Sequence, residues 1–108
     1  MRPYFPPNGG FAHQPTQKTL PKGTLLQRTG GTNGRYVAPA GTPKEMLSLP
    51  YNTAQEYTSY YQVLKPINVL SGTALPWFGQ IGGGTQYYLL DGNVQFLIDT
   101  RYITVWEK

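Results

Sequence analysis

The chain has 108 residues and a formal net charge of +4; it is 14% aromatic, with ten Pro and thirteen Gly. This length supports one modest hydrophobic core, and no apolar run approaches the roughly 20 residues of a membrane span. The absence of Cys and the single His exclude a disulfide framework, a thiolate zinc site, a Cys nucleophile and a multi-histidine metal site.

The positive charge is concentrated in the first part of the chain. Residues 1–44 contain no acidic side chain and six basic ones: Arg2, Lys18, Lys22, Arg28, Arg35 and Lys44. A basic half that faces a cleft attracts phosphate groups. The basic residues are spaced singly rather than clustered, so we do not predict a nucleic-acid partner.

The N-terminal residues 1–19 are rich in Pro, Gly, Asn and Gln and are predicted to form an irregular arm packed on a domain of residues 20–108. Phe5 and Phe11 are the side chains expected to attach this arm to the core. His13 lies in the same polar segment, and a surface position is favoured over a catalytic one.

The first half of the domain shows a strand–turn–strand pattern. Residues 24–29 are predicted to form a strand, residues 30–34 a hairpin-type connection rich in Gly, and residues 35–38 the returning strand. Residues 44–48 are predicted to make one helical turn, with Thr42 as its cap and Pro43 at its first position.

The second half contains further short elements. Strands are predicted at residues 60–65, 68–70, 86–90 and 102–106, and a short helix at residues 94–98 because three apolar side chains there share a helical face. The fold class is therefore α+β and mainly β: a single small antiparallel-sheet domain with one or two short helices and many loops.

The segment of residues 77–87 joins two aromatic side chains, Trp77 and Phe78, to a Gly-rich turn and a strand. Gly lets a ligand approach the main chain closely, and Gln80 and Gln86 flank the turn with neutral hydrogen-bonding groups. The turn is interpreted either as the floor of a binding cleft or as a hairpin connection without a ligand.

Residues able to carry out acid–base chemistry are few. The five carboxylates form no close pair in the sequence, and Asp91 and Asp99 precede Gly and Thr in patterns typical of structural turn residues. Arg28 and Arg35 flank the Gly-rich connection, where they are either partners for a phosphate group or solvated arginines at a hairpin end.

Several motifs occur in one order over nearly the whole chain. They are Pro6-Pro7-Asn8-Gly9-Gly10-Phe11, Leu20-Pro21-Lys22-Gly23-Thr24-Leu25-Leu26-Gln27-Arg28, Gly41-Thr42-Pro43 with Leu49-Pro50, Tyr61-Gln62-Val63-Leu64-Lys65-Pro66, and Ala74-Leu75-Pro76-Trp77-Phe78-Gly79-Gln80-Ile81-Gly82-Gly83-Gly84-Thr85-Gln86-Tyr87. In these motifs the chain resembles the tuberculosis necrotizing toxin (TNT) family of NAD glycohydrolases, which also occurs in fungal surface enzymes and bacterial polymorphic toxins.

The resemblance implies a set of site residues. The family's essential arginine corresponds to Arg28, an aromatic residue of the following strand to Tyr36, and the catalytic glutamine to Gln86. Two sources supply the expected substrate-binding residues. Arg35, the second arginine of the hairpin, comes from the hairpin pattern. The resemblance implies Ser59, Trp77, Phe78, Gln80, Gly83 and Gly84. Leu47 and Ser59 stand where relatives carry Arg and His, which leaves fewer polar contacts to a substrate.

The implied activity is cleavage of the bond between nicotinamide and ribose in NAD or NADP, without a cofactor or metal. Because the nicotinamide of NAD is cationic and leaves as a neutral molecule, the reaction suits a chain poor in acids. Two alternatives remain open: an ADP-ribosyltransferase toxin, and a non-enzymatic Tyr-rich β module that binds a glycan or a protein.

The resemblance also implies partners and a location. A toxin of this kind is expected to have a cognate immunity protein that covers the cleft and to act as a monomer. It is expected to be the C-terminal part of a longer secreted or delivered effector in interbacterial competition, acting in the target-cell cytoplasm.

Overall fold

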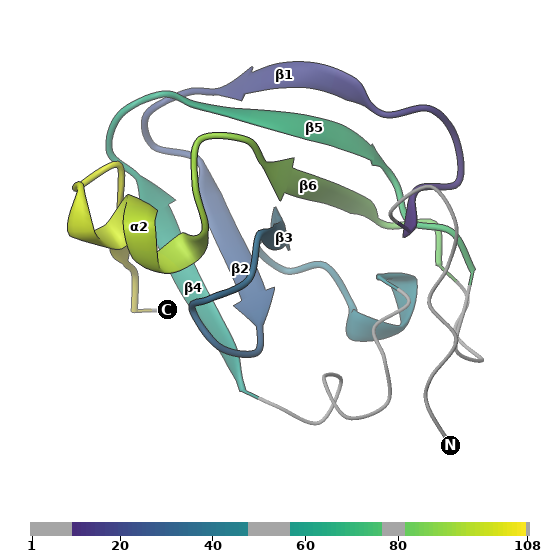
Figure 1. Ribbon diagram of the computed structural model, residues 1–108. Coiled ribbons are helices and arrows are strands. Elements are labelled where there is room, and N and C mark those ends of the chain that lie inside the picture. Colours follow the sequence, from purple (N-terminus) through teal and green to yellow (C-terminus); the bar gives the residue numbers. More distant parts are fainter. Residues whose placement is uncertain (1–9, 48–56, 77–81, 108) are drawn as a thin grey trace.

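The computed structural model describes residues 10–47, 57–76 and 82–107 (Figure 1). Seven strands in these ranges form one sheet in the order β1-β5-β6-β3-β2-β4-β7, and each pair of neighbours is antiparallel. The strands are β1 (Thr16–Leu20), β2 (Leu25–Thr29), β3 (Tyr36–Pro39), β4 (Thr58–Val63), β5 (Ile67–Thr73), β6 (Thr85–Leu89) and β7 (Ile103–Val105). The helices are η2 (Lys44–Met46), a 3-10 turn, and α2 (Val94–Asp99). The predicted α+β, mainly antiparallel fold is confirmed.

Strand β3 joins the two halves of the sheet. Its first residues pair with β6, at Tyr36↔Tyr88 and Val37↔Tyr87, whereas its last residues pair with β2. Figure 1 shows β1, β5 and β6 running at a steep angle to β2 and β4, with β3 between them. The sheet therefore bends at β3, and the neighbours of this strand diverge around it.

The bent sheet encloses one hydrophobic core. Alternate residues of β4, β5 and β6 face inward, as expected for strands with one buried face. Helix α2 adds Val94 and Leu97, which share one face of the helix. The core residues are Leu20, Leu26, Val37, Tyr61, Val63, Ile67, Val69, Tyr87, Leu89, Val94, Leu97 and Ile103. This packing holds both halves of the sheet in place around β3.

The prediction of an irregular arm was wrong for residues 16–19, which belong to strand β1. Residues 16–20 pair with residues 67–71 of β5, from Thr16↔Ser71 to Leu20↔Ile67. Four of the five β1 side chains are exposed, so the strand has no pattern of alternating burial. It forms because its backbone completes the edge of the sheet, which local sequence does not reveal. Phe11 is buried and forms a bridge with Ala74, as expected for an anchor, while Phe5 lies outside the described residues.

The predicted helical turn is present but is capped differently. It is the 3-10 turn η2, whose N-cap position is Pro43 and which has no side-chain cap. The hydroxyl of Thr42 instead donates to the carbonyl of Pro39 at 2.7 Å. The prediction of Thr42 as the cap is therefore wrong, because that hydroxyl closes the preceding turn.

The remaining elements match the predictions apart from their bounds. Strand β5 is longer than predicted because β1 and β6 pair with it from both sides. Helix α2 starts at an Asn93 cap, whose Oδ1 accepts from the backbone N–H of Phe96 at 2.8 Å. The carboxylate of Asp91 accepts the backbone N–H of Asn68 at 2.8 Å, and that of Asp99 accepts the amide of Gln95, so both have the predicted structural roles. Over the described residues, no helix has the length and apolar character that a membrane span requires.

Candidate active site at the bend of the sheet

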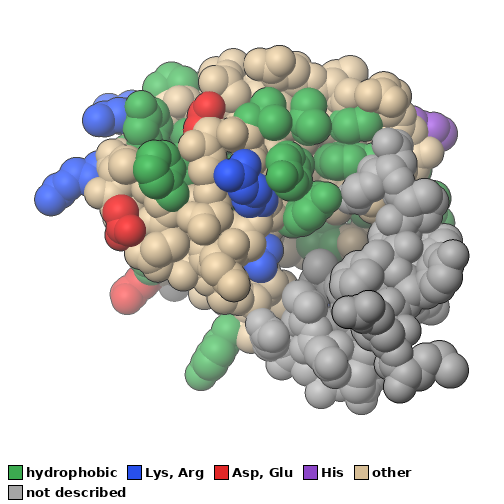
Figure 2. Space-filling model, viewed as in Figure 1, with side chains coloured by type: hydrophobic (Ala, Val, Ile, Leu, Met, Phe, Trp, Pro, Cys, Tyr) green, Lys and Arg blue, Asp and Glu red, His purple; other side chains and the backbone are tan. Residues whose placement is uncertain are grey.

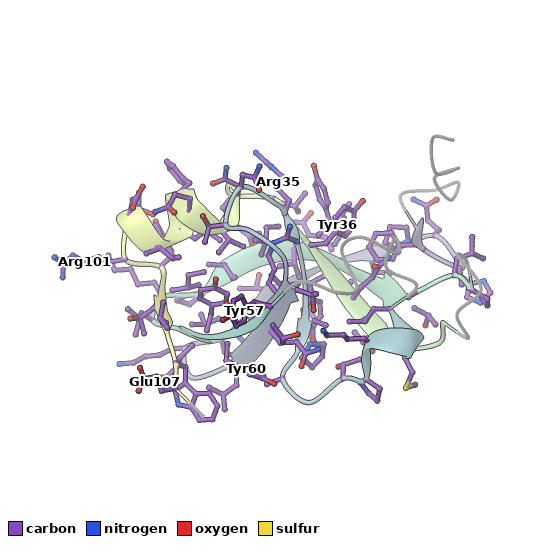
Figure 3. The ribbon with its side chains drawn as sticks, turned by 90° about the horizontal axis from the view of Figure 1, so that it is seen from below. Arg35, Tyr36, Tyr57, Tyr60, Arg101 and Glu107 are labelled. Carbon is purple, nitrogen blue, oxygen red and sulfur yellow. The ribbon has the colours of Figure 1, made fainter. Side chains whose placement is uncertain are left out.

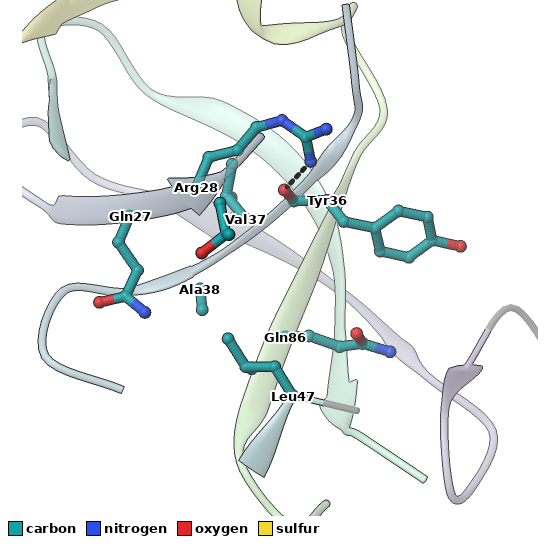
Figure 4. A pocket seen from close by; sticks show the side chains of 8 residues that line it. Gln27, Arg28, Tyr36, Val37, Ala38, Leu47 and Gln86 are labelled. Carbon is teal, nitrogen blue, oxygen red and sulfur yellow. Dashed lines mark hydrogen bonds between the residues drawn. The ribbon is translucent and has the colours of Figure 1, made fainter. Parts of the chain in front are cut away.

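A pocket opens where β2, β3 and β6 diverge. It is lined by Gln27, Arg28, Thr29, Tyr36, Val37, Ala38, Leu47 and Gln86 (Figure 4). About 330 Å³ of space lies in and above it, part of it open to solvent. The three residues that the sequence assigns to catalysis, Arg28, Tyr36 and Gln86, come from three different strands and meet here.

Arg28 supplies the positive charge of the pocket. Its Nε donates to the carbonyl of Gly31 at 2.6 Å, and its Nη1 donates to the carbonyl of Tyr36 at 2.9 Å. Both acceptors are backbone atoms of the β2–β3 hairpin, so the guanidinium is oriented by the main chain. Arg stays charged at every physiological pH.

Gln86 supplies a buried amide. The residue is 8% exposed, and its Nε2 is buried with no hydrogen-bond partner. An unmet buried donor costs about 1–3 kcal/mol, and such groups are rare in folded proteins. In Figure 4 the amide of Gln86 and the ring of Tyr36 are directed to the same side of the pocket. This donor is therefore ready for an acceptor on a bound molecule.

Tyr36 stands at the mouth of the pocket. Its ring meets that of Tyr88 edge to face, with 5.1 Å between centroids. Burial raises the pKa of the Tyr36 phenol above its ordinary value of 10.0, and the neighbouring Tyr88 raises it further. The phenol is therefore a neutral donor throughout the physiological pH range.

The structure places the predicted substrate-binding residues in different surroundings. Arg35 does not line the pocket: its Nη1 donates to the carbonyl of Leu89 at 3.2 Å, and its guanidinium lies 5.9 Å from the centroid of the Tyr88 ring. Ser59 pairs with Arg28 across β2 and β4, next to the pocket but not in its lining.

The Gly-rich turn leads directly to Gln86. Gly83 is exposed and has a φ of 85°, which favours Gly, and Gly84 is buried. The N–H of Gly84 donates to the carbonyl of Met46 at 2.9 Å, which ties the start of β6 to η2. Trp77, Phe78 and Gln80 lie outside the described residues.

Sequence reasoning did not single out Gln27, which lines the same pocket. It is 3% exposed; its Oε1 accepts the N–H of Gly41 at 2.8 Å, and its Nε2 donates to the carbonyl of Thr42 at 2.7 Å. These two hydrogen bonds hold residues 41 and 42, which lead to η2 and to Leu47, an apolar residue of the pocket lining. In the sequence, only the position of Gln27 next to Arg28 on a predicted strand points to it. Both faces of β2 bury side chains, so no alternating pattern of burial marks Gln27.

The charged side chains of the described residues are dispersed over the molecule. Figure 3 shows Arg101 and Glu107 well apart from Tyr36, and Figure 2 shows basic side chains dispersed among hydrophobic ones. Among the described lining residues, Arg28 is the one permanent charge. Within the described ranges, no group of three or more His, Asp or Glu side chains could hold a metal ion. The arrangement can bind an anion beside a neutral, hydrogen-bonding polar group.

These features define a small α+β domain with a pocket at a bend in its sheet. Residues 19–105 match the family described as tuberculosis necrotizing toxin (TNT), and the chain belongs to this family. It is 40% identical over 112 residues to a protein of Aspergillus fumigatus named conidial surface nicotinamide adenine dinucleotide glycohydrolase nadA. That match covers 92% of this chain and 47% of the relative, so the chain spans about half the length of the curated relative.

Solved structures share the fold at lower identity. Tuberculosis necrotizing toxin, in complex with its immunity factor, matches with a TM-score of 0.76 and 23% identity, over 93% of this chain and 60% of the toxin. Rhs1-CT, in complex with its cognate immunity protein RhsI1, matches with a TM-score of 0.64 and 18% identity, over 91% of this chain and 81% of Rhs1-CT. At these identities the likeness concerns the fold.

Proposed function

We propose that this chain is a glycohydrolase of NAD. In the reaction, the bond between C1′ of the ribose and N1 of nicotinamide breaks, and its electron pair goes to the nicotinamide nitrogen. The oxygen of a water molecule bonds to C1′ and loses one proton to solvent, so the products are nicotinamide and ADP-ribose. Membership of the family, the activity after which the 40%-identical relative is named, and the pocket at the bend all support this proposal.

The composition of the pocket suits this chemistry. Nicotinamide leaves as a neutral molecule, so no general acid has to protonate it. Positive charge moves onto the ribose in the transition state, as in other glycoside cleavages. The protein then needs to hold the diphosphate, orient the ribose and admit water, which are tasks of positioning. None of the described lining residues is a carboxylate or a His.

Each of three residues has a distinct role in the proposal. The oriented guanidinium of Arg28 binds the diphosphate, for which its planar fork of donors is well suited. The amide of Gln86 hydrogen-bonds a ribose hydroxyl or the attacking water, an interaction that strengthens as charge develops. Tyr36 packs beside the nicotinamide or the ribose.

The other predicted substrate-binding residues remain predictions, and their distances from the pocket differ. Arg35, which precedes β3 and does not line the pocket, would reach the diphosphate only from outside the lining. Ser59, which pairs with Arg28 across β2 and β4, would contact the substrate near the diphosphate. Gly83 and Gly84 would let the substrate approach the main chain that precedes Gln86.

The observation that carries the proposal is the unpaired amide of Gln86 in the pocket of Arg28. A buried donor without a partner is retained in a fold when a ligand uses it, because it otherwise only costs stability. The amide and the guanidinium are held on separate strands, so one rigid pocket presents both to the same molecule.

The test is nicotinamide release from NAD by the purified protein. We expect Arg28→Ala and Gln86→Ala each to lose at least about 100-fold in turnover, as for loss of a positioned transition-state donor. Lys22→Ala and Gln17→Ala are matched controls, since both side chains are exposed outside the pocket. The controls should keep full activity and all four variants should keep the fold.

The products separate this proposal from its alternatives. Free ADP-ribose in equal amount to nicotinamide supports hydrolysis. Labelled protein in place of free ADP-ribose would indicate an ADP-ribosyltransferase, and no nicotinamide at all would indicate a binding module. Full turnover by both Arg28→Ala and Gln86→Ala would show that this pocket is not the active site.

Two biological consequences belong to the same proposal. Loss of NAD harms a cell from within, so the chain acts as a delivered effector in the target-cell cytoplasm, either on NAD or on NADP. Its producer then needs a cognate immunity protein that covers the pocket; the two related folds described above were solved with such partners.

A further inference from the structure

We propose that Gly34 is a positioning residue: its missing side chain leaves the space in which the guanidinium of Arg28 is held. This inference rests on the proposed function, because it concerns the residue assigned to the diphosphate. A Cβ placed on Gly34 would lie 2.7 Å from Nη1 of Arg28, and closer still to Nη2 and Cζ. Real Cβ atoms are not found at such distances from other atoms.

Backbone conformation does not explain the glycine. Gly30, in the same connection, has a φ of 115°, which side chains rarely adopt, whereas Gly34 is not among the residues with positive φ. The φ of Gly34 is therefore not one that requires a glycine. What Gly34 contributes is therefore room beside Arg28.

The backbone of the hairpin cannot retreat from the guanidinium. The carbonyl of Gly34 accepts the N–H of Val94 at 3.0 Å, and that of Thr32 accepts the N–H of Gln95 at 2.8 Å. The hydroxyl of Thr32 also donates to the Gln95 side chain at 2.8 Å. On the other side, the carbonyl of Arg35 accepts the N–H of Leu89 at 2.8 Å. Helix α2 and strand β6 thus hold both flanks of Gly34.

A side chain at Gly34 would consequently displace Arg28 and not the main chain. The atoms in its way form the far end of a long, flexible side chain, which can move at little cost in stability. Moving would break the bonds from Nε to the Gly31 carbonyl and from Nη1 to the Tyr36 carbonyl, which aim the guanidinium. Gly34 therefore acts on the substrate through Arg28.

The test is Gly34→Ala, measured by NAD turnover and thermal unfolding. We expect kcat/KM to fall about 10- to 100-fold, as for a misplaced catalytic group, with the Tm unchanged. Asn33→Ala, an exposed neighbour in the same connection, should keep both. Gly23→Ala should give the reverse pattern. Gly23 has a φ of 94°, which strains the backbone of any residue with a side chain, but a Cβ there would meet no other atom within 4 Å. Gly23 also lies outside the pocket lining. The substitution should lower the Tm and leave kcat/KM intact.

A double-mutant cycle shows whether the effect passes through Arg28. Lys lacks the two Nη atoms that the new Cβ would meet, and its single Nζ, which stands where Arg has Cζ, can rotate away. Gly34→Ala should therefore lower kcat/KM less in an Arg28→Lys background than in the wild type. If Gly34→Ala alone lowers the Tm, adding Arg28→Ala should restore the Tm to that of Arg28→Ala, because truncation empties the space.

The possible failures are distinguishable. Wild-type kcat/KM in Gly34→Ala, with Arg28→Ala inactive, would overturn this inference and leave the proposed function standing. An undiminished loss in the Arg28→Lys background would also overturn it, since Gly34 would then act through another group. Wild-type turnover by Arg28→Ala would refute the site itself, and the role of Gly34 with it.

Discussion

The two buried glutamines of the pocket allow a sharp test of the unpaired amide. Gln86 and Gln27 both lie on strands, line the same pocket and are less than a tenth exposed. They differ in that Gln27 uses both ends of its amide, whereas Nε2 of Gln86 has no partner. The same substitution, Gln→Met, preserves most of the shape of the side chain and should have opposite effects on stability at the two positions.

The magnitudes follow from the hydrogen bonds. Gln86→Met removes an unmet buried donor, which costs about 1–3 kcal/mol, so the free energy of unfolding should rise by about 1–2 kcal/mol. Gln27→Met removes two bonds of about 1 kcal/mol each and leaves the Gly41 N–H and the Thr42 carbonyl without this partner. It should lower the free energy of unfolding by about 1–3 kcal/mol.

Urea denaturation measures both changes. With a slope of about 2 kcal/mol/M, a change of 1 kcal/mol moves the midpoint by about 0.5 M, and the Tm moves by about 4–8 °C. The slope should stay constant, which shows that the unfolded state is unaffected. Gln86→Met should also have lost NAD turnover. If Gln86→Met were destabilised as much as Gln27→Met, the amide of Gln86 would have a partner in the free protein and our reasoning would be refuted.

Two further predictions concern pH and the Gly-rich turn. Because the described lining residues other than Arg28 and Tyr36 do not ionise, and the pKa of Tyr36 is raised above 10.0, kcat/KM should be constant from about pH 6 to about pH 9; a bell-shaped profile would show that another group takes part. Because the pKa of Tyr36 is raised in the folded state, the folded protein keeps this proton to a higher pH than the unfolded chain. The stabilisation that follows is fully present below pH 10 and is lost as the pH rises through the pKa of the folded state. A Cβ on Gly84 would lie 3.0 Å from the Cβ and carbonyl of Met46 and from the Thr42 methyl, so Gly84→Ala should lower both the Tm and turnover; an unchanged Tm would show that the η2 segment can move aside.

Much of the local structure could be predicted from neighbouring residues. Helix α2 was recognisable from three apolar residues on one face, and the β2–β3 hairpin from Gly-rich residues between two apolar strands. Strand β1 was missed because its side chains are exposed and only the edge of β5 makes it a strand. The Thr42 cap was wrong because the N-cap position of η2 is Pro43, and the Thr42 hydroxyl donates to the preceding turn.

The candidate site, like the fold, was only partly predictable from the sequence. The resemblance pointed to Arg28, Tyr36 and Gln86 by position in the chain, although it could not show that they share a pocket. The hairpin pattern also grouped Arg35 with Arg28, whereas the carbonyl of Leu89 and the ring of Tyr88 hold Arg35 outside the lining. Gln27 carried no signal beyond its place before Arg28, because its role depends on its hydrogen bonds to residues 41 and 42.

The sequence by itself determined which chemical groups are available: a chain without Cys, poor in acids, with an arginine before a Gly-rich hairpin and a glutamine after a Gly-rich turn. Tertiary structure alone decided where these groups meet, because β3 pairs with β6 at one end and β2 at the other and so draws together residues 28, 36 and 86. It also decided that Nε2 of Gln86 has no partner among the described residues and that Gly34 leaves room for Arg28, since both facts depend on how the atoms are packed in three dimensions.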